Sequence, residues 1–232
     1  MADDDDNKRE RIVAARLKLR DRFKAASEAS PSLADPEPLG SGPRNRHGMP
    51  RLPVDQHETR KWPVLDLGRQ PEVSQVRWRL VVDGACARPL ELDWAAFMAL
   101  EQIADVSDFH CVTAWSRFDV PWRGVRLADV IALAEPTDAA HAVMLHGYDG
   151  YTTNLQLAEA VKPDVLLVHT ADGKPLSVEH GGPVRVITPQ LYAWKGAKWV
   201  SRIELMPVDR PGFWEQNGYS MTAYPWRNDR YS

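Results

Sequence analysis

The chain has 232 residues, of which 44% are hydrophobic and 26% charged, and its net charge is −3. This length suffices for one large domain or two small ones with a sizeable core. The near balance of charge gives no general reason to bind nucleic acid or a membrane surface, and no segment approaches the roughly 18 apolar residues of a membrane span. We therefore expect no nucleic-acid partner and no membrane span, and any anion site must be local.

The N-terminus predicts where the protein works. Acidic residues 3–6 follow Met1, and neither an apolar run of signal-peptide length nor a twin-arginine leader comes after them. The chain has two cysteines, Cys86 and Cys111, and unpaired thiols are ordinary in a reducing compartment. We therefore expect a cytoplasmic protein.

Residues from about Asn7 to Ala29 are predicted to form an amphipathic helix. The segment is rich in helix formers and places Ile12, Arg16 and Leu19 three to four residues apart. Its basic residues could favour a membrane surface, but acidic residues are interspersed among them. Packing on its own domain or on a partner is the preferred interpretation.

The segment after this helix is rich in proline, glycine and serine. Such a composition from Ser30 to Pro53 predicts a linker or a wrapping arm without helix or sheet. Residues 1–53 are thus predicted to be a helix and an arm, and residues 54–232 a catalytic domain with a C-terminal tail.

The main body alternates predicted strands with short helices. Alternation and turn residues predict strands near residues 76–82, 143–145, 151–155, 165–170, 184–188 and 200–206, and helices at 93–100 and 127–134. Asp149-Gly150 between two strand-like runs is a strong hairpin signal. Strands outnumber helices, and no GxGxxG, P-loop or internal repeat is present, so we predict an α+β fold with mixed sheets rather than a doubly wound one.

Cys111 is the first candidate for chemistry. It lies in Phe109-His110-Cys111-Val112-Thr113-Ala114-Trp115-Ser116, where polar and aromatic residues favour a shaped pocket. A buried, inert thiol is the alternative, because free cysteine often packs as a small hydrophobe. A single thiolate cannot hold a metal with cysteines alone, so other soft ligands would have to come from elsewhere.

Three further segments carry dense polar residues. The first, from His180 to Arg185, contains paired glycines that allow close backbone approach to a ligand, although Gly-Gly-Pro is also simply a turn. The second places Lys195 and Lys198 on either side of Gly196, and solvated lysines are its alternative interpretation. Arginine and lysine together suit a phosphate, so these segments are candidates for one anion site. The third, residues 147–154, holds tyrosines that equally suit hairpin packing.

Together these segments resemble the molybdopterin domain of the sulfite oxidase family. The resemblance rests on His110-Cys111-Val112-Thr113-Ala114-Trp115-Ser116, Gly150-Tyr151-Thr152-Thr153-Asn154-Leu155, His180-Gly181-Gly182-Pro183-Val184-Arg185 and Lys195-Gly196-Ala197-Lys198-Trp199, in that order, over roughly residues 54–207. The tail Pro211-Gly212-Phe213-Trp214-Glu215 resembles bacterial members. Four ordered motifs are far more specific than any single one.

The resemblance implies a sulfite oxidase fold and a molybdenum centre with molybdopterin, in which the pterin dithiolene supplies two sulfurs and Cys111 the third. It also implies oxygen-atom transfer, or a related two-electron reaction, on a small substrate such as sulfite, a sulfoxide or an N-oxide. A separate electron-transfer partner would be needed. The implied catalytic residues are Cys111 and Tyr151, and the implied cofactor-binding residues are His57, His110, Cys111, His180, Arg185, Lys195, Gly196 and Lys198.

The chain also departs from the family pattern. In animal and plant sulfite oxidases a Gly-Asn-Arg run follows the molybdenum cysteine and its arginine helps to bind sulfite, whereas residues 112–116 here are Val-Thr-Ala-Trp-Ser. That segment resembles the catalytic subunit of a bacterial methionine sulfoxide reductase instead. No Cys-x-x-Cys-His haem motif is present. The missing arginine leaves open an alternative function as a non-catalytic molybdopterin-binding or carrier protein.

Overall fold

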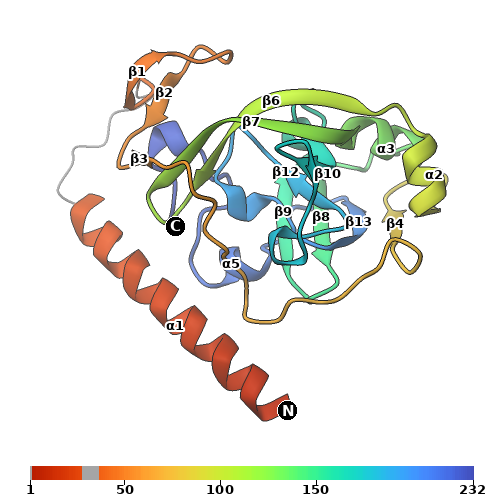
Figure 1. Cartoon of the computed structure of the whole chain (residues 1–232), viewed down its shortest axis with the longest axis horizontal. Coiled ribbons are helices and arrows are strands. Elements are labelled where there is room, and N and C mark those ends of the chain that lie inside the picture. The colour runs from red at the N-terminus through yellow and green to blue at the C-terminus, as the bar shows by residue number, and fades with distance from the viewer. Residues whose placement is uncertain (1, 28–36) are drawn as a thin grey trace.

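The computed structural model describes residues 2–27 and 37–232. Its strands form a two-stranded, a six-stranded and a five-stranded sheet, with short helices between them (Figure 1). The helices are α1 (Ala2–Ser27), α2 (Trp94–Ala99), α3 (Leu127–Leu133), α4 (Leu157–Ala160) and α5 (Phe213–Gln216), with 3₁₀ helices η1 (Val178–His180), η2 (Ala193–Lys195) and η3 (Pro225–Arg227). The strands are β1 (Gly40–Arg44), β2 (Pro50–Pro53), β3 (His57–Glu58), β4 (Arg79–Gly84), β5 (Leu90–Asp93), β6 (Ile103–Cys111), β7 (Trp115–Arg126), β8 (Ala142–Gly147), β9 (Thr152–Gln156), β10 (Leu166–Ala171), β11 (Lys174–Pro175), β12 (Arg185–Ile187) and β13 (Val200–Met206). The predicted α+β class with mixed sheets is confirmed.

The five-stranded sheet has the order β5-β4-β13-β8-β9, with β13 parallel to β4 and antiparallel to β8. It contains the predicted hairpin, in which β8 and β9 pair antiparallel with Leu145 opposite Thr153. Gly150 has φ +81° in the connecting turn, a conformation that glycine adopts without strain. Asp149 Oδ1 accepts a hydrogen bond from Tyr151 N at 3.1 Å, which fixes where Tyr151 leaves the turn.

The six-stranded sheet is built around the long hairpin β6–β7, which the sequence did not predict. Strand β7 also pairs with β10 and, in parallel, with β3, while β12 pairs with β10. At the end of β6, Phe109, His110 and Cys111 are all buried, so both faces of the strand are covered there. Polar and apolar residues therefore do not alternate, and the usual strand signal is absent.

Two predicted helices are confirmed, and each begins for a local reason. Asp93 caps α2, its Oδ1 accepting from Ala96 N at 2.8 Å. In α3 the residues Leu127, Val130 and Ile131 are buried, at the three- and four-residue spacing of one helix face. Both helices pack against the sheets, and neither contributes a residue to the cavity described below.

The prediction that residues 30–53 form no sheet is wrong for the part that is described. Residues 28–36 lie outside the described residues, but β1 and β2 form an antiparallel hairpin. A Cβ atom at Gly40 would lie 2.3 Å from Leu52 O, so glycine permits this close pairing. Proline is tolerated because both strands of an isolated pair are edge strands. The hairpin is fixed to the tail by Leu39 N donating to Trp226 O at 2.7 Å.

Helix α1 is present and packs on the body of the protein, as predicted. Its half-buried residues follow one helix face: Arg9, Ile12, Val13, Arg16, Leu17, Leu19 and Arg20. Lys8 Nζ donates to Gly68 O at 2.9 Å, and Arg20 Nη1 donates to Asn217 O at 3.1 Å. In Figure 1 the helix (red) runs along the outside of the body, below the β1–β2 hairpin. Within residues 2–27 and 37–232, no helix has both the length and the apolar character that a bilayer crossing requires.

Candidate active site

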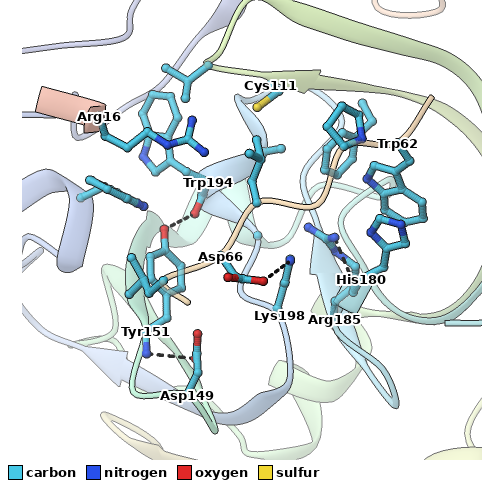
Figure 2. Close-up of a pocket in the computed structure, with 18 of the residues that line it drawn as sticks. Arg16, Trp62, Asp66, Cys111, Asp149, Tyr151, His180, Arg185, Trp194 and Lys198 are labelled. Carbon is cyan, nitrogen blue, oxygen red and sulfur yellow. Dashed lines mark hydrogen bonds and ion pairs between the residues drawn. The ribbon is translucent and has the colours of Figure 1, made fainter. Parts of the chain in front are cut away.

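A cavity opens where α1, the segment 62–67 and the end of β6 come together (Figure 2). About 800 Å³ of space lies between its walls, a figure that includes solvent at its open side. The residues that line it are Arg16, Trp62, Pro63, Leu65, Asp66, Leu67, Phe109, Cys111, Val112, Trp115, Asp149, Tyr151, His180, Arg185, Ala193, Trp194, Gly196, Lys198, Trp199, Trp214 and Tyr219. Indole rings form much of the wall, and the polar groups are few.

Cys111 ends β6 and lines this cavity, with 6% of its surface exposed. Its Sγ lies 3.1 Å from Thr113 Oγ1. Burial raises the pKa of the Cys111 thiol, while hydrogen bonds from Thr113 and the charges of Arg16 and Arg230 oppose that rise. A positive partner in the cavity would favour the thiolate, the form that binds metals.

A cluster of basic side chains, His180, Arg185 and Lys198, lies at the opposite side of the cavity from Tyr151 (Figure 2). Arg185 is 3% exposed, and its Nη1 donates to His180 O at 3.2 Å. Lys198 Nζ donates to the carbonyl oxygen of Glu179 at 2.6 Å. The imidazole of His180 stacks on Trp62, with 4.0 Å between ring centroids and 8° between planes. Each side chain of the cluster is therefore held in place.

The pKa values of this basic cluster are lowered mainly by burial, and for Lys198 and His180 also by the charge of Arg185. Burial, and then the charge of Arg185, lowers the pKa of Lys198 to about 8. Burial and the same arginine lower the pKa of His180 to about 4. Burial lowers the pKa of Arg185 to about 10, so at neutral pH Arg185 and Lys198 are charged and His180 is neutral. An anion in the cavity would relieve this repulsion.

Glycines bring the basic cluster together. A Cβ atom at Gly181, where φ is +100°, would lie 2.9 Å from Lys198 Cβ and 3.1 Å from Arg185 Cβ. At Gly196 a Cβ atom would lie 2.3 Å from Val186 O. The two segments picked out by sequence therefore meet in space, and glycine is required at their contact.

Tyr151 lies at the start of the β9 segment and is 8% exposed. Its hydroxyl donates to Trp194 O at 2.5 Å. Burial, followed by the nearby Glu215 carboxylate, raises the pKa of Tyr151 well above its usual value. The phenol thus keeps its proton at any physiological pH, and its oxygen retains acceptor capacity.

Three predicted cofactor-binding residues do not line the cavity. His57 is exposed on β3, where its backbone N donates to Ala114 O at 3.0 Å. His110 is buried, and its Nδ1 lies 2.8 Å from Ser116 Oγ. Neighbouring side chains along a strand point to opposite faces, so His110 points away from the cavity that Cys111 lines. Lys195 is fully buried and pairs with Glu215 at 2.7 Å.

The cavity also contains residues that sequence reasoning did not assign to it. Arg16 comes from α1, and Trp62 and Asp66 from the segment before β4. Lys198 Nζ lies 3.8 Å from Asp66 Oδ2, and Arg185 lies against the Trp62 ring, 5.7 Å from its centroid. None of the three belongs to a motif, and the helical stripe that contains Arg16 predicted only packing. No signal in the sequence indicated that these segments meet Cys111.

Comparison with known proteins identifies the family. Residues 67–214 match the model of the oxidoreductase molybdopterin binding domain. The chain belongs to this family. The matched range contains Cys111, Tyr151 and the whole basic cluster, and the resemblance to the sulfite oxidase family is confirmed.

Two relatives support the membership, and one solved structure shares the fold. The chain is 40% identical over 183 residues to the "Uncharacterized oxidoreductase YuiH" of Bacillus subtilis, covering 78% of this chain and 92% of that protein. It is 31% identical over 163 residues to the protein-methionine-sulfoxide reductase catalytic subunit MsrP of Burkholderia mallei, covering 63% of this chain and 48% of the relative. The sulfane dehydrogenase SoxCD of Paracoccus pantotrophus shares the fold, with a TM-score of 0.57 and 18% sequence identity. The match covers 65% of this chain and 43% of the SoxCD chain.

The protein is thus an oxidoreductase of the sulfite oxidase family with a molybdopterin cofactor. The residues in the cavity fit that group. Cys111 offers a soft thiolate ligand, and Arg185 and Lys198 are buried cations without a full complement of anions, as a pterin phosphate requires. In the described part of the chain, no three His, Cys, Asp or Glu side chains group as a metal site of their own.

Proposed function

We propose that this protein is a molybdenum enzyme that moves an oxygen atom to or from a small substrate in the cavity. The observation that carries the proposal is that one cavity holds both the Cys111 thiol and the basic cluster. A carrier for molybdopterin would need the basic cluster, but it has no need for a metal-binding thiolate facing the same space.

The roles of individual residues follow from their positions. Cys111 would bind molybdenum, while His180, Arg185, Gly196 and Lys198 would bind the pterin and its phosphate. Lys195 would hold the neighbouring Gly196 in position through its buried ion pair with Glu215. His57 and His110 would support the segments that flank Cys111 rather than contact the cofactor.

When bound, the molybdenum–molybdopterin centre supplies two-electron redox chemistry with oxygen-atom transfer. The chain supplies the surroundings. Indole walls, including those of Trp115 and Trp194, exclude water and lower the local dielectric constant, which strengthens each polar contact. Tyr151 keeps its hydroxyl proton, which it donates to Trp194 O in this structure and could donate to a substrate oxygen instead. Neutral His180 can accept or donate without adding charge.

Sulfur compounds are the first substrates to test. The name of the MsrP relative refers to a sulfoxide, and that similarity covers about half of the relative's length. We therefore propose sulfite, a sulfoxide or an N-oxide as the substrate class, with the direction of transfer decided by experiment. A separate protein or a small carrier would exchange electrons with the centre.

Elemental analysis tests the metal directly. Protein produced in a molybdate-replete host is expected to carry nearly one molybdenum and one pterin per chain. The Cys111→Ala variant is expected to lose turnover and most molybdenum while it retains pterin. Cys86→Ala removes the other free cysteine, which does not line the cavity, and is expected to behave as the unmodified protein. Full activity in Cys111→Ala, or no molybdenum in the unmodified protein, would refute the proposal.

A further inference from the structure

Arg16 is a cation of the cavity that comes from outside the matched family domain. It lies on α1, whereas the family match begins at residue 67. Figure 2 shows its guanidinium entering the cavity from the side of α1, in the region between Cys111 and Trp194. Burial raises the pKa of both Cys111 and Tyr219, and the positive charge of Arg16 opposes each rise, so the guanidinium lies within electrostatic reach of both side chains.

Contacts on either side of Arg16 hold α1 against the body of the protein beside the cavity. Towards the N-terminus, Lys8 donates to Gly68 O, and Arg9 lies 4.8 Å from the centroid of the Phe213 ring. Towards the C-terminus, Arg20 donates to Asn217 O. Arg16 is on the same helix face, between these anchors, so the packing of α1 directs it inward.

Arg16 differs from the other cavity cations in having no partner among the described residues. Arg185 donates to His180 O, and Lys198 donates to Glu179 O and lies near Asp66. Among the residues whose side chains the structure describes, 5–21 and 37–232, none forms a hydrogen bond or an ion pair with the Arg16 guanidinium. An arginine held among indole rings without an acceptor retains its full capacity to bind an anion.

Arg16 supplies a cation that the segment after Cys111 lacks. The residues after Cys111 are Val112, Thr113 and Ala114, so the segment supplies no arginine to the cavity. Arg16 and the basic cluster enter the cavity from different elements, α1 on one side and the segments around β12 on the other. The two groups can therefore bind two different anions.

We propose that Arg16 is a substrate-binding residue, that α1 is part of the active site, and that the substrate is accordingly a small oxyanion rather than a neutral sulfoxide. The guanidinium offers paired N–H donors that match two oxygens of such an anion. The inference rests on the proposed function, because it assigns the basic cluster to the cofactor and Arg16 to the substrate. It leaves the direction of oxygen transfer open.

The test uses cofactor-loaded protein and equilibrium binding of sulfate, an oxyanion that undergoes no oxygen transfer here, measured by titration calorimetry at low ionic strength. Arg16→Gln is expected to weaken sulfate binding by about 10- to 100-fold, the range for loss of a charge-assisted hydrogen-bonded contact. Arg16→Lys should keep part of the affinity. The matched control is Arg11→Gln, which removes an exposed charge from the same helix and should change nothing. Dimethyl sulfoxide, a neutral ligand, should respond to none of these substitutions.

Molybdenum and pterin contents are measured for every variant. Circular dichroism measures whether the helix content is unchanged, as expected if α1 stays folded, because glutamine is a good helix former. Unchanged sulfate affinity in loaded Arg16→Gln would overturn the inference. So would loss of cofactor from that variant, because Arg16 would then bind the cofactor. Absence of molybdenum from the unmodified protein would instead refute the proposed function, so the two failures are distinguishable. With sulfite as substrate, Arg16→Gln should raise KM far more than it lowers kcat.

Discussion

Lys195 and Glu215 form an ion pair with 2.7 Å between Nζ and Oε1, and both side chains are fully buried. The same Oε1 accepts hydrogen bonds from Trp194 Nε1 and from Thr153 Oγ1, each at 3.0 Å. One carboxylate oxygen thus ties η2, β9 and the tail helix α5 together beneath the cavity. Trp194 is itself part of the cavity wall, so this pair supports the site without entering it.

Removing one partner of this pair should be costly. Lys195→Met leaves the buried Glu215 carboxylate without its cation, and we expect a loss of about 3–5 kcal/mol in the free energy of unfolding. Arg202→Met is the control, because it breaks the half-exposed pair with Asp83, where we expect at most about 1 kcal/mol. Denaturant titration measures both. Similar losses in the two variants would contradict the structural role of Lys195.

Gly181 should be irreplaceable for cofactor binding. In Gly181→Ala the new Cβ atom would press on Lys198 Cβ and Arg185 Cβ, at 2.9 and 3.1 Å, and would displace the basic cluster. Gly173 has a comparable positive φ of +71° but open space around it, so Gly173→Ala carries the backbone strain alone. We expect pterin content to fall strongly only in Gly181→Ala. Equal pterin content in both variants would show that the glycine is needed for its turn only.

Cofactor affinity should depend on pH through Lys198. Its pKa, lowered to about 8 by burial and by Arg185, means that it is charged at pH 7 and largely neutral at pH 9. A phosphate binds the charged form better, so the affinity for molybdopterin is expected to fall by up to about tenfold between these pH values. Measuring pterin retention after dialysis at each pH checks this. In Lys198→Met the affinity should be lower throughout and should lose this dependence on pH.

Tyr151 should matter for turnover more than for stability. Tyr151→Phe removes the hydrogen bond to Trp194 O, which costs about 1 kcal/mol of stability, and also removes the one hydroxyl proton that Tyr151 could redirect to a substrate. Tyr148→Phe loses a comparable hydroxyl, whose bonds go to the Arg79 backbone and whose ring does not line the cavity. Rapid-mixing measurements of cofactor reduction should be slowed at least about tenfold in Tyr151→Phe alone, a modest share of the effect expected for a proton-handling group. Unchanged rates would remove Tyr151 from the catalytic residues.

The predicted secondary structure succeeded where local chemistry decides it. Asp93 caps its helix and Asp149-Gly150 makes its turn, both through contacts within a few residues. It failed at β6, where Val106 is exposed, Ser107 is buried and the last three residues are all buried, and at the β1–β2 hairpin, whose stability depends on contacts with Trp226 far along the chain. Distant contacts leave no periodic signal in the segments that make them.

By itself the sequence determined the family and the α+β class, because ordered motifs are specific to a family. It also predicted one site for Cys111, Tyr151, His180, Arg185, Gly196 and Lys198, and all six line the same cavity. Only the tertiary structure decided which neighbours face the cavity. His110 and Lys195 belong to the same motifs as Cys111 and Lys198, yet side-chain direction along a strand and within a 3₁₀ turn sends them elsewhere. Arg16 reaches the cavity only because α1 packs on the body of the protein, and this packing depends on contacts with residues far from Arg16 in the chain, such as Gly68 and Asn217.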